Sequence, residues 1–271
     1  SNGKYTCKDV TATWVTTGHV GNFSDPLVDC KGCGSRQRAD KLIEACEAGK
    51  AVNVDAMSFE EMDAMMYKIE GEDLYLIGTS EHSMIGKFID TINDESKLPY
   101  TLTSYSPCFR KEKGAHGIEE RGVYRIHQFE KQEMIVVCKP EESKMWFDKL
   151  WQNTVDLFRS MDIPVRTLEC CSGDLADLKV KSVDVEAWSP RQKKYFEVGS
   201  CSNLGDAQAR RLRIRVNGPD GKKYFAHTLN NTVVAPPRML IAFLENNLQA
   251  DGSVRIPEVL RPYMGGKTEI K

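Results

Sequence analysis

The chain has 271 residues, of which 41% are hydrophobic, enough to bury one large core or two smaller ones. Its 37 basic and 39 acidic residues exclude a protein that binds nucleic acid through bulk positive charge, and they leave room only for a local basic patch. Its apolar runs are far shorter than the roughly 20 residues that cross a bilayer, and the first residues lack a signal pattern, so we expect a cytoplasmic protein without membrane contact.

The first 65 residues differ from the rest of the chain in composition, because glycine and charged residues dominate part of them. We expect residues 1–23 to form the N-terminal edge of the main domain. Residues 24–65 are interpreted as an inserted subdomain with two helices, at 39–48 and 58–67.

A Cys-x-x-Cys pair, Cys30 and Cys33, lies in this inserted subdomain. Such a pair supplies half of the four ligands of a structural Zn²⁺ site, and Cys7, Cys46 and His19 are the residues that could complete it. The alternative is a glycine-containing turn with two free thiols. Free thiols agree with the nine cysteines of the chain, which are odd in number and scattered.

Residues 66–271 are predicted to form the main domain, in which strands outnumber helices. Strand patterns cover residues 74–77, 101–110, 123–138, 165–170, 182–188, 195–201, 212–216 and 224–230. Helical patterns cover residues 83–92, 141–161 and 238–247. Because the strands follow one another like hairpins, we predict an α+β fold with an antiparallel sheet, its helices packed on one face.

Polar side chains gather where two of these strands are joined by a long loop. Because side chains alternate along a strand, Arg110 and Glu112 should point the same way at the end of the first strand. The returning strand should present one face made of Arg125, His127, Phe129, Lys131 and Glu133. This set suits a nucleotide and an amine, with Arg110 on a phosphate, Phe129 on the base and Glu133 on an ammonium. The alternative is an exposed face with charge pairs between strands.

Four other segments favour the nucleotide interpretation. They are residues 79–81 before a helix, Asp184 and Glu186 on a strand, residues 197–200 at a strand end, and residues 229–238, which lead from a strand into a helix. Together they supply arginines for phosphates, carboxylates for a metal ion and a small polar pocket. For Asp184 and Glu186 a structural role is equally open.

Several motifs, in this order, resemble class II seryl-tRNA synthetases. They are Phe-Arg-x-Glu at 109–112, His-Gln-Phe-x-Lys-x-Glu at 127–133, Ser-Cys-Ser-Asn at 200–203, Gln-Ala-Arg-Arg at 208–211, Leu-Asn-x-Thr-x-x-Ala-x-x-Arg at 229–238 and Leu-Glu-Asn-Asn at 244–247. The resemblance covers residues 66–266 and implies the family's catalytic core, an antiparallel sheet flanked by helices. It also implies the activity of an aminoacyl-tRNA ligase that activates L-serine with ATP as seryl-adenylate and transfers it to tRNA(Ser).

The resemblance assigns roles to individual positions. The residues implied to hold serine are Thr79, Glu81, Arg110, Glu133, Asn230 and Thr232, the last two at the position that reads the hydroxyl. The residues implied to contact ATP are Arg110, Glu112, Ile126, Phe129, Glu197, Ser200 and Arg238. Among these, Arg110, Glu112 and Arg238 would be catalytic, and Glu197 and Ser200 would bind Mg²⁺. Glu197 and Ser200 are three positions apart, so a bulge or a strand end must bring them to one face.

Two features depart from the family. The helical arm that grips tRNA and the first family motif, which forms the dimer interface, are not visible, so we expect weakened contact with tRNA(Ser) and a homodimer only where that motif is supplied. Residues 18–31 and 36–40 are more similar to archaeal-type glycyl-tRNA synthetases, which leaves glycine as a second substrate candidate. Two other functions stay open: a ligase that charges a carrier protein, and an inactive regulatory paralogue.

Overall fold

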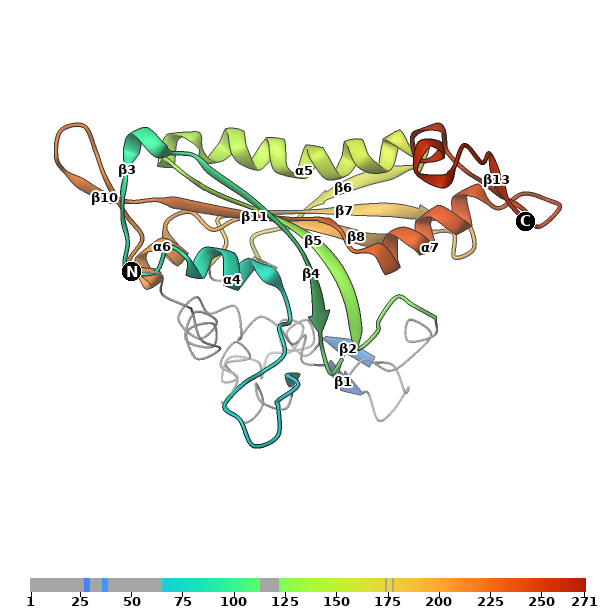
Figure 1. Cartoon of the computed structure of the whole chain (residues 1–271), viewed down its shortest axis with the longest axis horizontal. Coiled ribbons are helices and arrows are strands. Elements are labelled where there is room, and N and C mark those ends of the chain that lie inside the picture. The colour runs from blue at the N-terminus through green and yellow to red at the C-terminus, as the bar shows by residue number, and fades with distance from the viewer. Residues whose placement is uncertain (1–26, 30–35, 39–64, 113–121, 174, 177) are drawn as a thin grey trace.

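The computed structural model describes residues 27–29, 36–38, 65–112, 122–173, 175–176 and 178–271 (Figure 1). In the predicted inserted subdomain it describes two short antiparallel strands, β1 (Leu27–Asp29) and β2 (Arg36–Arg38). The candidate zinc ligands Cys7, His19, Cys30, Cys33 and Cys46 lie outside the described residues, so the zinc site and the bounds of the subdomain stay predictions. Within the described ranges, no helix is long and apolar enough to cross a membrane.

A six-stranded antiparallel sheet forms the centre of the described domain. Its strands, in spatial order, are β4 (Tyr100–Phe109), β5 (Gln128–Cys138), β11 (His227–Val234), β8 (Lys194–Asn203), β7 (Lys181–Ser189) and β6 (Val165–Glu169). All neighbouring pairs are antiparallel. The predicted α+β fold with an antiparallel sheet is therefore confirmed.

The longest described helix, α5 (Ser143–Ser160), covers one face of the sheet (Figure 1). Its buried side chains include Phe147, Leu150, Thr154 and Phe158, at the three- and four-residue spacing of one helix face. Phe147 and Leu150 share a core with side chains from β5, β7, β8 and β11: Val136, Val183, Cys201 and Leu229.

Shorter helices cover the opposite face of the sheet. Residues of α4 (Ser80–Gly86) and α6 (Ala207–Leu212) pack in a second core with Ile135 and Val137 of β5, whereas Val136 packs with α5. Neighbouring strand residues point to opposite faces, so the prediction that all helices back one face was wrong. The sequence does indicate that both faces of this strand are covered, because residues 135–138 form an uninterrupted apolar run, which is typical of a strand buried on both sides. In the structure all four of these residues are buried.

The remaining elements are short and surround this frame. They are α7 (Pro236–Asn247), β3 (Ile92–Asp94), η2 (Glu95–Lys97), η4 (Pro140–Glu142), β9 (Arg215–Asn217), β10 (Lys223–Phe225), β12 (Val254–Arg255), η5 (Glu258–Met264) and β13 (Glu269–Ile270). The helix α7 lies against the end of β7, where the Asn246 side chain donates a hydrogen bond to the Trp188 carbonyl (2.8 Å).

Several predicted boundaries were wrong. The helix predicted at 83–92 begins earlier and ends at Gly86, after which residues 92–94 form β3. The strand predicted at 74–77 is only an isolated bridge at Tyr75, and β5 begins at Gln128 instead of at residue 123. The strand predicted at 212–216 is the end of α6 followed by β9, because Arg213 adopts a left-handed φ of 57° that stops the helix.

Candidate active site

Two adjoining cavities lie on the face of the sheet that carries α4, each with a volume of about 170 Å³. The one that we call the Glu133 pocket is lined by residues that include Thr79, Glu81, Glu133, Lys179, Ser200 and Asn230. The one that we call the Arg238 cavity is lined by residues that include Glu112, Tyr124, Ile126, Phe129, Glu197 and Arg238. Arg110, Lys131 and Thr232 line both, so these side chains form the shared wall.

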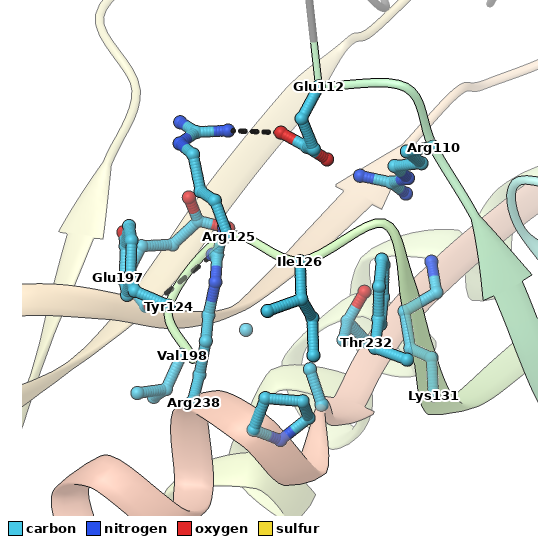
Figure 2. A pocket seen from close by; sticks show the side chains of 14 residues that line it. Arg110, Glu112, Tyr124, Arg125, Ile126, Lys131, Glu197, Val198, Thr232 and Arg238 are labelled. Atoms are coloured by element: carbon cyan, nitrogen blue, oxygen red, sulfur yellow. Dashed lines mark hydrogen bonds and ion pairs between the residues drawn. The ribbon is translucent and has the colours of Figure 1, made fainter. Parts of the chain in front are cut away.

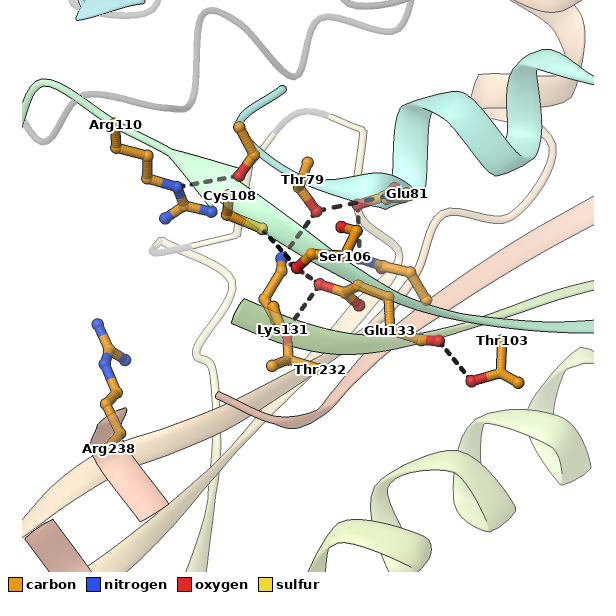
Figure 3. A network of polar contacts seen from close by, with 12 residues as sticks. Thr79, Glu81, Thr103, Ser106, Cys108, Arg110, Lys131, Glu133, Thr232 and Arg238 are labelled. Atoms are coloured by element: carbon orange, nitrogen blue, oxygen red, sulfur yellow. Dashed lines mark hydrogen bonds and ion pairs between the residues drawn. The ribbon is translucent and has the colours of Figure 1, made fainter. Parts of the chain in front are cut away.

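A chain of polar contacts joins β4, β5 and β11 to the start of α4 in the Glu133 pocket (Figure 3). The carboxylate of Glu133 is 1% exposed; its Oε1 accepts a hydrogen bond from Thr232 Oγ1 at 2.9 Å and forms an ion pair with Lys131 Nζ. Lys131 Nζ also donates to Thr79 Oγ1 at 2.7 Å. Because Phe129, Lys131 and Glu133 alternate along β5, they reach this face together, as the sequence predicted.

Glu81 is the second buried carboxylate of the pocket. It sits in the first turn of α4, whose N-cap is Thr79, and Thr79 Oγ1 accepts from the Glu81 backbone N–H at 3.5 Å. Two amide side chains donate to the Glu81 carboxylate: Asn230 Nδ2 at 2.7 Å and Gln208 Nε2 at 3.5 Å. The Thr-Ser-Glu sequence thus serves as a helix start and fixes both side chains beside β11.

Two buried oxygen atoms of this pocket lack donors within the described part of the chain. They are Glu133 Oε2 and Asn230 Oδ1. A buried acceptor without a partner costs about 1–3 kcal/mol, so such atoms in a pocket wall indicate a ligand that brings the missing donors. A ligand that carries both an ammonium and a hydroxyl group is suited to them.

The Arg238 cavity is built around a charged side chain from the first turn of α7 (Figure 2). Arg238 Nη1 lies 3.2 Å from Glu197 Oε1 and donates to the Glu197 carbonyl at 3.3 Å, while its guanidinium lies 4.6 Å from the centre of the Tyr124 ring. Burial lowers the pKa of Arg238, but the negative charge of Glu197 and its other partners outweighs burial, so the pKa is raised overall. Arg238 therefore stays charged, and a charged arginine is suited to bind a phosphate.

Arg110 stands between the two cavities, at the end of β4. Its Nε donates to the Gly78 carbonyl at 3.2 Å, and its guanidinium lies 5.3 Å from the centre of the Phe129 ring. Burial lowers the pKa of Arg110 from its ordinary value, and the nearby Cys108 and Glu112 counteract part of this shift. Arginine is effectively always protonated in proteins, so Arg110 is a cation at neutral pH.

Glu112 lines the Arg238 cavity together with Arg110, but it does so outside the strand, so the predicted alternation along β4 does not explain its position. The strand ends at Phe109, and Glu112 has a left-handed φ of 47° in the turn that follows. There its Oε2 pairs with Arg125 Nη1 at 3.2 Å (Figure 2). Arg125, Tyr124 and Ile126 come from an irregular segment before β5 and line the cavity in succession.

A bulge lies where the sequence required one. The pairing of β7 with β8 shifts after Val185, so that Asp184 faces Ser200 while Glu186 faces Glu197. Burial, and then the charge of Glu197, raise the pKa of Asp184 above its ordinary value. Glu197 nevertheless lines the Arg238 cavity and Ser200 the Glu133 pocket, so the assignment of Ser200 to ATP stays a prediction.

The described residues contain no group of three or more His, Cys, Asp and Glu side chains that gathers for a metal ion. Mg²⁺ rarely needs such a group, because it is commonly bound by one or two carboxylates together with substrate phosphates. Glu197 with Ser200, next to the half-buried Asp184, fits that requirement, since a cation here would relieve the repulsion between the two carboxylates.

The structure thus brings the predicted site residues together in two neighbouring groups. Among the residues to which the sequence analysis gave no role are the wall residues Tyr124, Leu178 and Lys179, and Gln208, which is buried behind Glu81. Gln208 lies in the Gln-Ala-Arg-Arg motif, which was noticed without a role. Leu178 and Lys179 lie outside helices and strands, where periodicity gives no signal. His127, predicted on the same face as Phe129, is exposed and pairs with the Tyr67 hydroxyl at 2.6 Å.

Comparisons with known proteins agree with this arrangement. The profile of the tRNA synthetase class II core domain (G, H, P, S and T) matches residues 65–247. The serine–tRNA ligase of Methanospirillum hungatei is 46% identical over 215 residues, which are 79% of this chain and 51% of that protein. The one from Thermococcus sibiricus is 46% identical over 219 residues, 80% of this chain and 48% of that protein. The chain spans about half the length of the curated relatives it matches.

Solved structures of seryl-tRNA synthetases are also similar to this chain. The seryl-tRNA synthetase of Pyrococcus horikoshii complexed with ATP superposes with a TM-score of 0.74 at 37% identity, covering 98% of this chain and 57% of that one. The cytoplasmic serine–tRNA ligase of Naegleria fowleri in complex with AMP superposes with a TM-score of 0.72 at 39% identity, covering 80% of this chain and 51% of that one.

Proposed function

Because the chain belongs to the class II tRNA synthetase core family, we propose that it activates L-serine with ATP as seryl-adenylate and passes the seryl group to tRNA(Ser). The observation that carries this proposal is the pair of buried acceptors, Glu133 Oε2 and Asn230 Oδ1, in a small pocket beside the Arg238 cavity. Serine supplies an ammonium and a hydroxyl to these atoms. ATP, which the named Pyrococcus horikoshii complex contains, is assigned to the Arg238 cavity.

The reaction that we assign is an in-line displacement at the α-phosphorus of ATP. A carboxylate oxygen of serine forms a bond to that phosphorus, and the bond from phosphorus to the bridging oxygen of pyrophosphate breaks. The serine carboxylate is already ionised at neutral pH, so no general base is required. Catalysis then consists of positioning and charge neutralisation.

Arg110 is assigned to the centre of this step. As part of the wall between the two cavities, it can hold the serine carboxylate and the α-phosphate at once. Arg238 would bind the γ-phosphate, and Phe129 would stack on adenine. Mg²⁺ held by Glu197 and Ser200 would supply positive charge to the phosphates of the leaving pyrophosphate.

Selectivity for serine follows from the same buried atoms. Thr232 donates to Glu133, and Asn230 donates to Glu81, so these carboxylates are held in place before the substrate arrives. Alanine and glycine lack the hydroxyl and would leave a buried acceptor unpaired. A site built to hydrogen-bond a substrate hydroxyl can reject the analogue that lacks it by about ten-thousandfold.

Serine-dependent exchange of pyrophosphate into ATP tests this function, with glycine, alanine and threonine as comparison substrates. We expect exchange with serine and, relative to it, exchange with alanine and glycine lower by several orders of magnitude. Exchange with glycine and none with serine would overturn the assignment of the pocket. Transfer to tRNA(Ser), a homodimeric state and a cytoplasmic location belong to the same proposal. The transfer is supported by the names of the relatives, serine–tRNA ligases, and the homodimer by the motif resemblance alone.

A further inference from the structure

Lys131 has no role in the function proposed above, yet it occupies the middle of the site. Its side chain is 9% exposed and belongs to the wall that the Glu133 pocket and the Arg238 cavity share (Figures 2 and 3). Lysine is rarely buried to this degree unless its charge is paired. Its ammonium is paired with Glu133 Oε1 and donates to Thr79 Oγ1 at 2.7 Å.

Both partners of the Lys131 ammonium belong to the residues assigned to serine. They are Thr79 and Glu133, and an α-ammonium has the same charge and the same three donors as a lysine ammonium. The Glu133 carboxylate is 1% exposed, and a carboxylate so buried requires a cation beside it. Lys131 supplies that cation at Oε1, and a serine ammonium that binds at the unpaired Oε2 would stand beside it, so the two like charges compete for Glu133.

The structure also offers a second position for the Lys131 ammonium, in the Arg238 cavity. Since its side chain lines the Arg238 cavity as well, a rotation about its own flexible chain moves the ammonium from Glu133 toward Arg110 and the expected ATP phosphates. A lysine in that cavity would add a second positive charge next to Arg110.

We propose, on the basis of the serine function above, that the Lys131 ammonium is an internal placeholder for the substrate ammonium. Serine displaces it from Glu133, and the released ammonium turns toward the Arg238 cavity, where it strengthens the binding of the ATP phosphates. Serine and ATP thereby favour each other's binding, and the coupling is reciprocal.

The first experiment measures the binding of serinol, an amine with hydroxyl groups and no carboxylate, by calorimetry without nucleotide. Lys131→Met keeps the volume of the side chain and removes the competing ammonium, so serinol should bind about tenfold more tightly if Lys131 fills the site nine-tenths of the time. Lys131→Gln, which keeps a polar group but no charge, should also bind serinol more tightly. Thermal unfolding reports whether both variants fold.

Lys179→Met is the matched control, because Lys179 lines the same pocket, whereas the ion pair of Glu133 within the described part of the chain is with Lys131. It removes one positive charge from the pocket but leaves the Lys131–Glu133 pair, so it should not tighten serinol binding. Equal or weaker serinol binding by both Lys131 variants would overturn the placeholder, and so would an equal gain in Lys179→Met.

The second experiment measures serine affinity with and without α,β-methylene ATP, which cannot react at the α-phosphorus. In the unchanged chain the nucleotide should tighten serine binding about tenfold, and in Lys131→Met this coupling should vanish. Coupling that persists in Lys131→Met would overturn the release toward the nucleotide. A chain that binds no serine at all contradicts the proposed function, whereas one that binds serine and shows neither effect contradicts only this inference.

Discussion

The two cavities differ in how deeply their polar and charged side chains are buried and in how these side chains are held. In the Glu133 pocket the key side chains are almost fully buried, with Glu133 1%, Thr79 2% and Glu81 5% exposed, and hydrogen bonds from neighbouring strands hold them. In the Arg238 cavity the charged side chains are more open, with Glu197 43% and Arg125 36% exposed. A pocket that must tell serine from alanine needs groups fixed in advance, whereas a cavity for a large polyanion can use ion pairs that open and re-form.

This difference predicts which property each substitution should change. Buried hydrogen bonds act in a low dielectric, and removal of one partner leaves the other unsatisfied at a cost of about 1–3 kcal/mol. Partly exposed ion pairs are weakened by water and by salt, and are worth about 0.2–1 kcal/mol. Changes in the Glu133 pocket should therefore alter amino-acid selectivity strongly, and changes at the rim of the Arg238 cavity should alter ATP affinity weakly.

Arg110 belongs to both cavities, so its loss should have the largest effect. Arg110→Ala removes the cation proposed to bind the serine carboxylate and the α-phosphate together, and we expect serine-dependent pyrophosphate exchange to fall about a thousandfold. Arg255→Ala, which removes a surface arginine paired with Asp162, is the control for loss of charge. Exchange near the unchanged level in Arg110→Ala would remove this residue from the mechanism.

Thr232 lies in the shared wall, and its hydroxyl tests the hydrogen bonding of the Glu133 pocket. Thr232→Val keeps the shape of the side chain but deletes the hydroxyl that donates to Glu133 Oε1, so kcat/KM for serine should fall about 10- to 100-fold while KM for ATP changes little. Thr103→Val is a matched control, because its hydroxyl donates to the backbone carbonyl of Glu133 at 2.9 Å instead. The comparison of the two cavities fails if Thr232→Val raises KM for ATP as much as it lowers serine use.

Much of this frame was accessible from the sequence, because alternation along a strand is a local property. The alternating pattern of Phe129, Lys131 and Glu133 was enough to place them on one face of β5. Glu197 and Ser200 are three positions apart, so a regular strand would place them on opposite faces, and the sequence therefore predicted a bulge between them. The pairing of β7 with β8 shifts there. The motif resemblance then supplied roles that periodicity cannot give.

What the sequence could not predict depends on contacts between distant segments. Gln208 reaches Glu81 across 127 positions of sequence, and only the folded arrangement of α6 and α4 brings them together. Glu112 reaches the Arg238 cavity through a left-handed turn, which strand alternation cannot foresee. Lys131 was placed on the correct face, but its pairing with Glu133 and Thr79 follows from burial, which a single sequence does not report.

Arg125 tests the rim of the Arg238 cavity, where we expect the smallest effect. Its guanidinium pairs with Glu112 at 3.2 Å while 36% of its side chain stays exposed, so water weakens the pair. Arg125→Ala should raise KM for ATP only about threefold and leave the preference for serine over alanine unchanged. Because the pair is partly exposed, the difference from the unchanged chain should shrink further between about 0.05 M and 0.3 M salt. A change as large as that expected for Thr232→Val, or a change in amino-acid preference, would mean that the rim is organised in advance like the Glu133 pocket, and the division of labour between the two cavities would not hold.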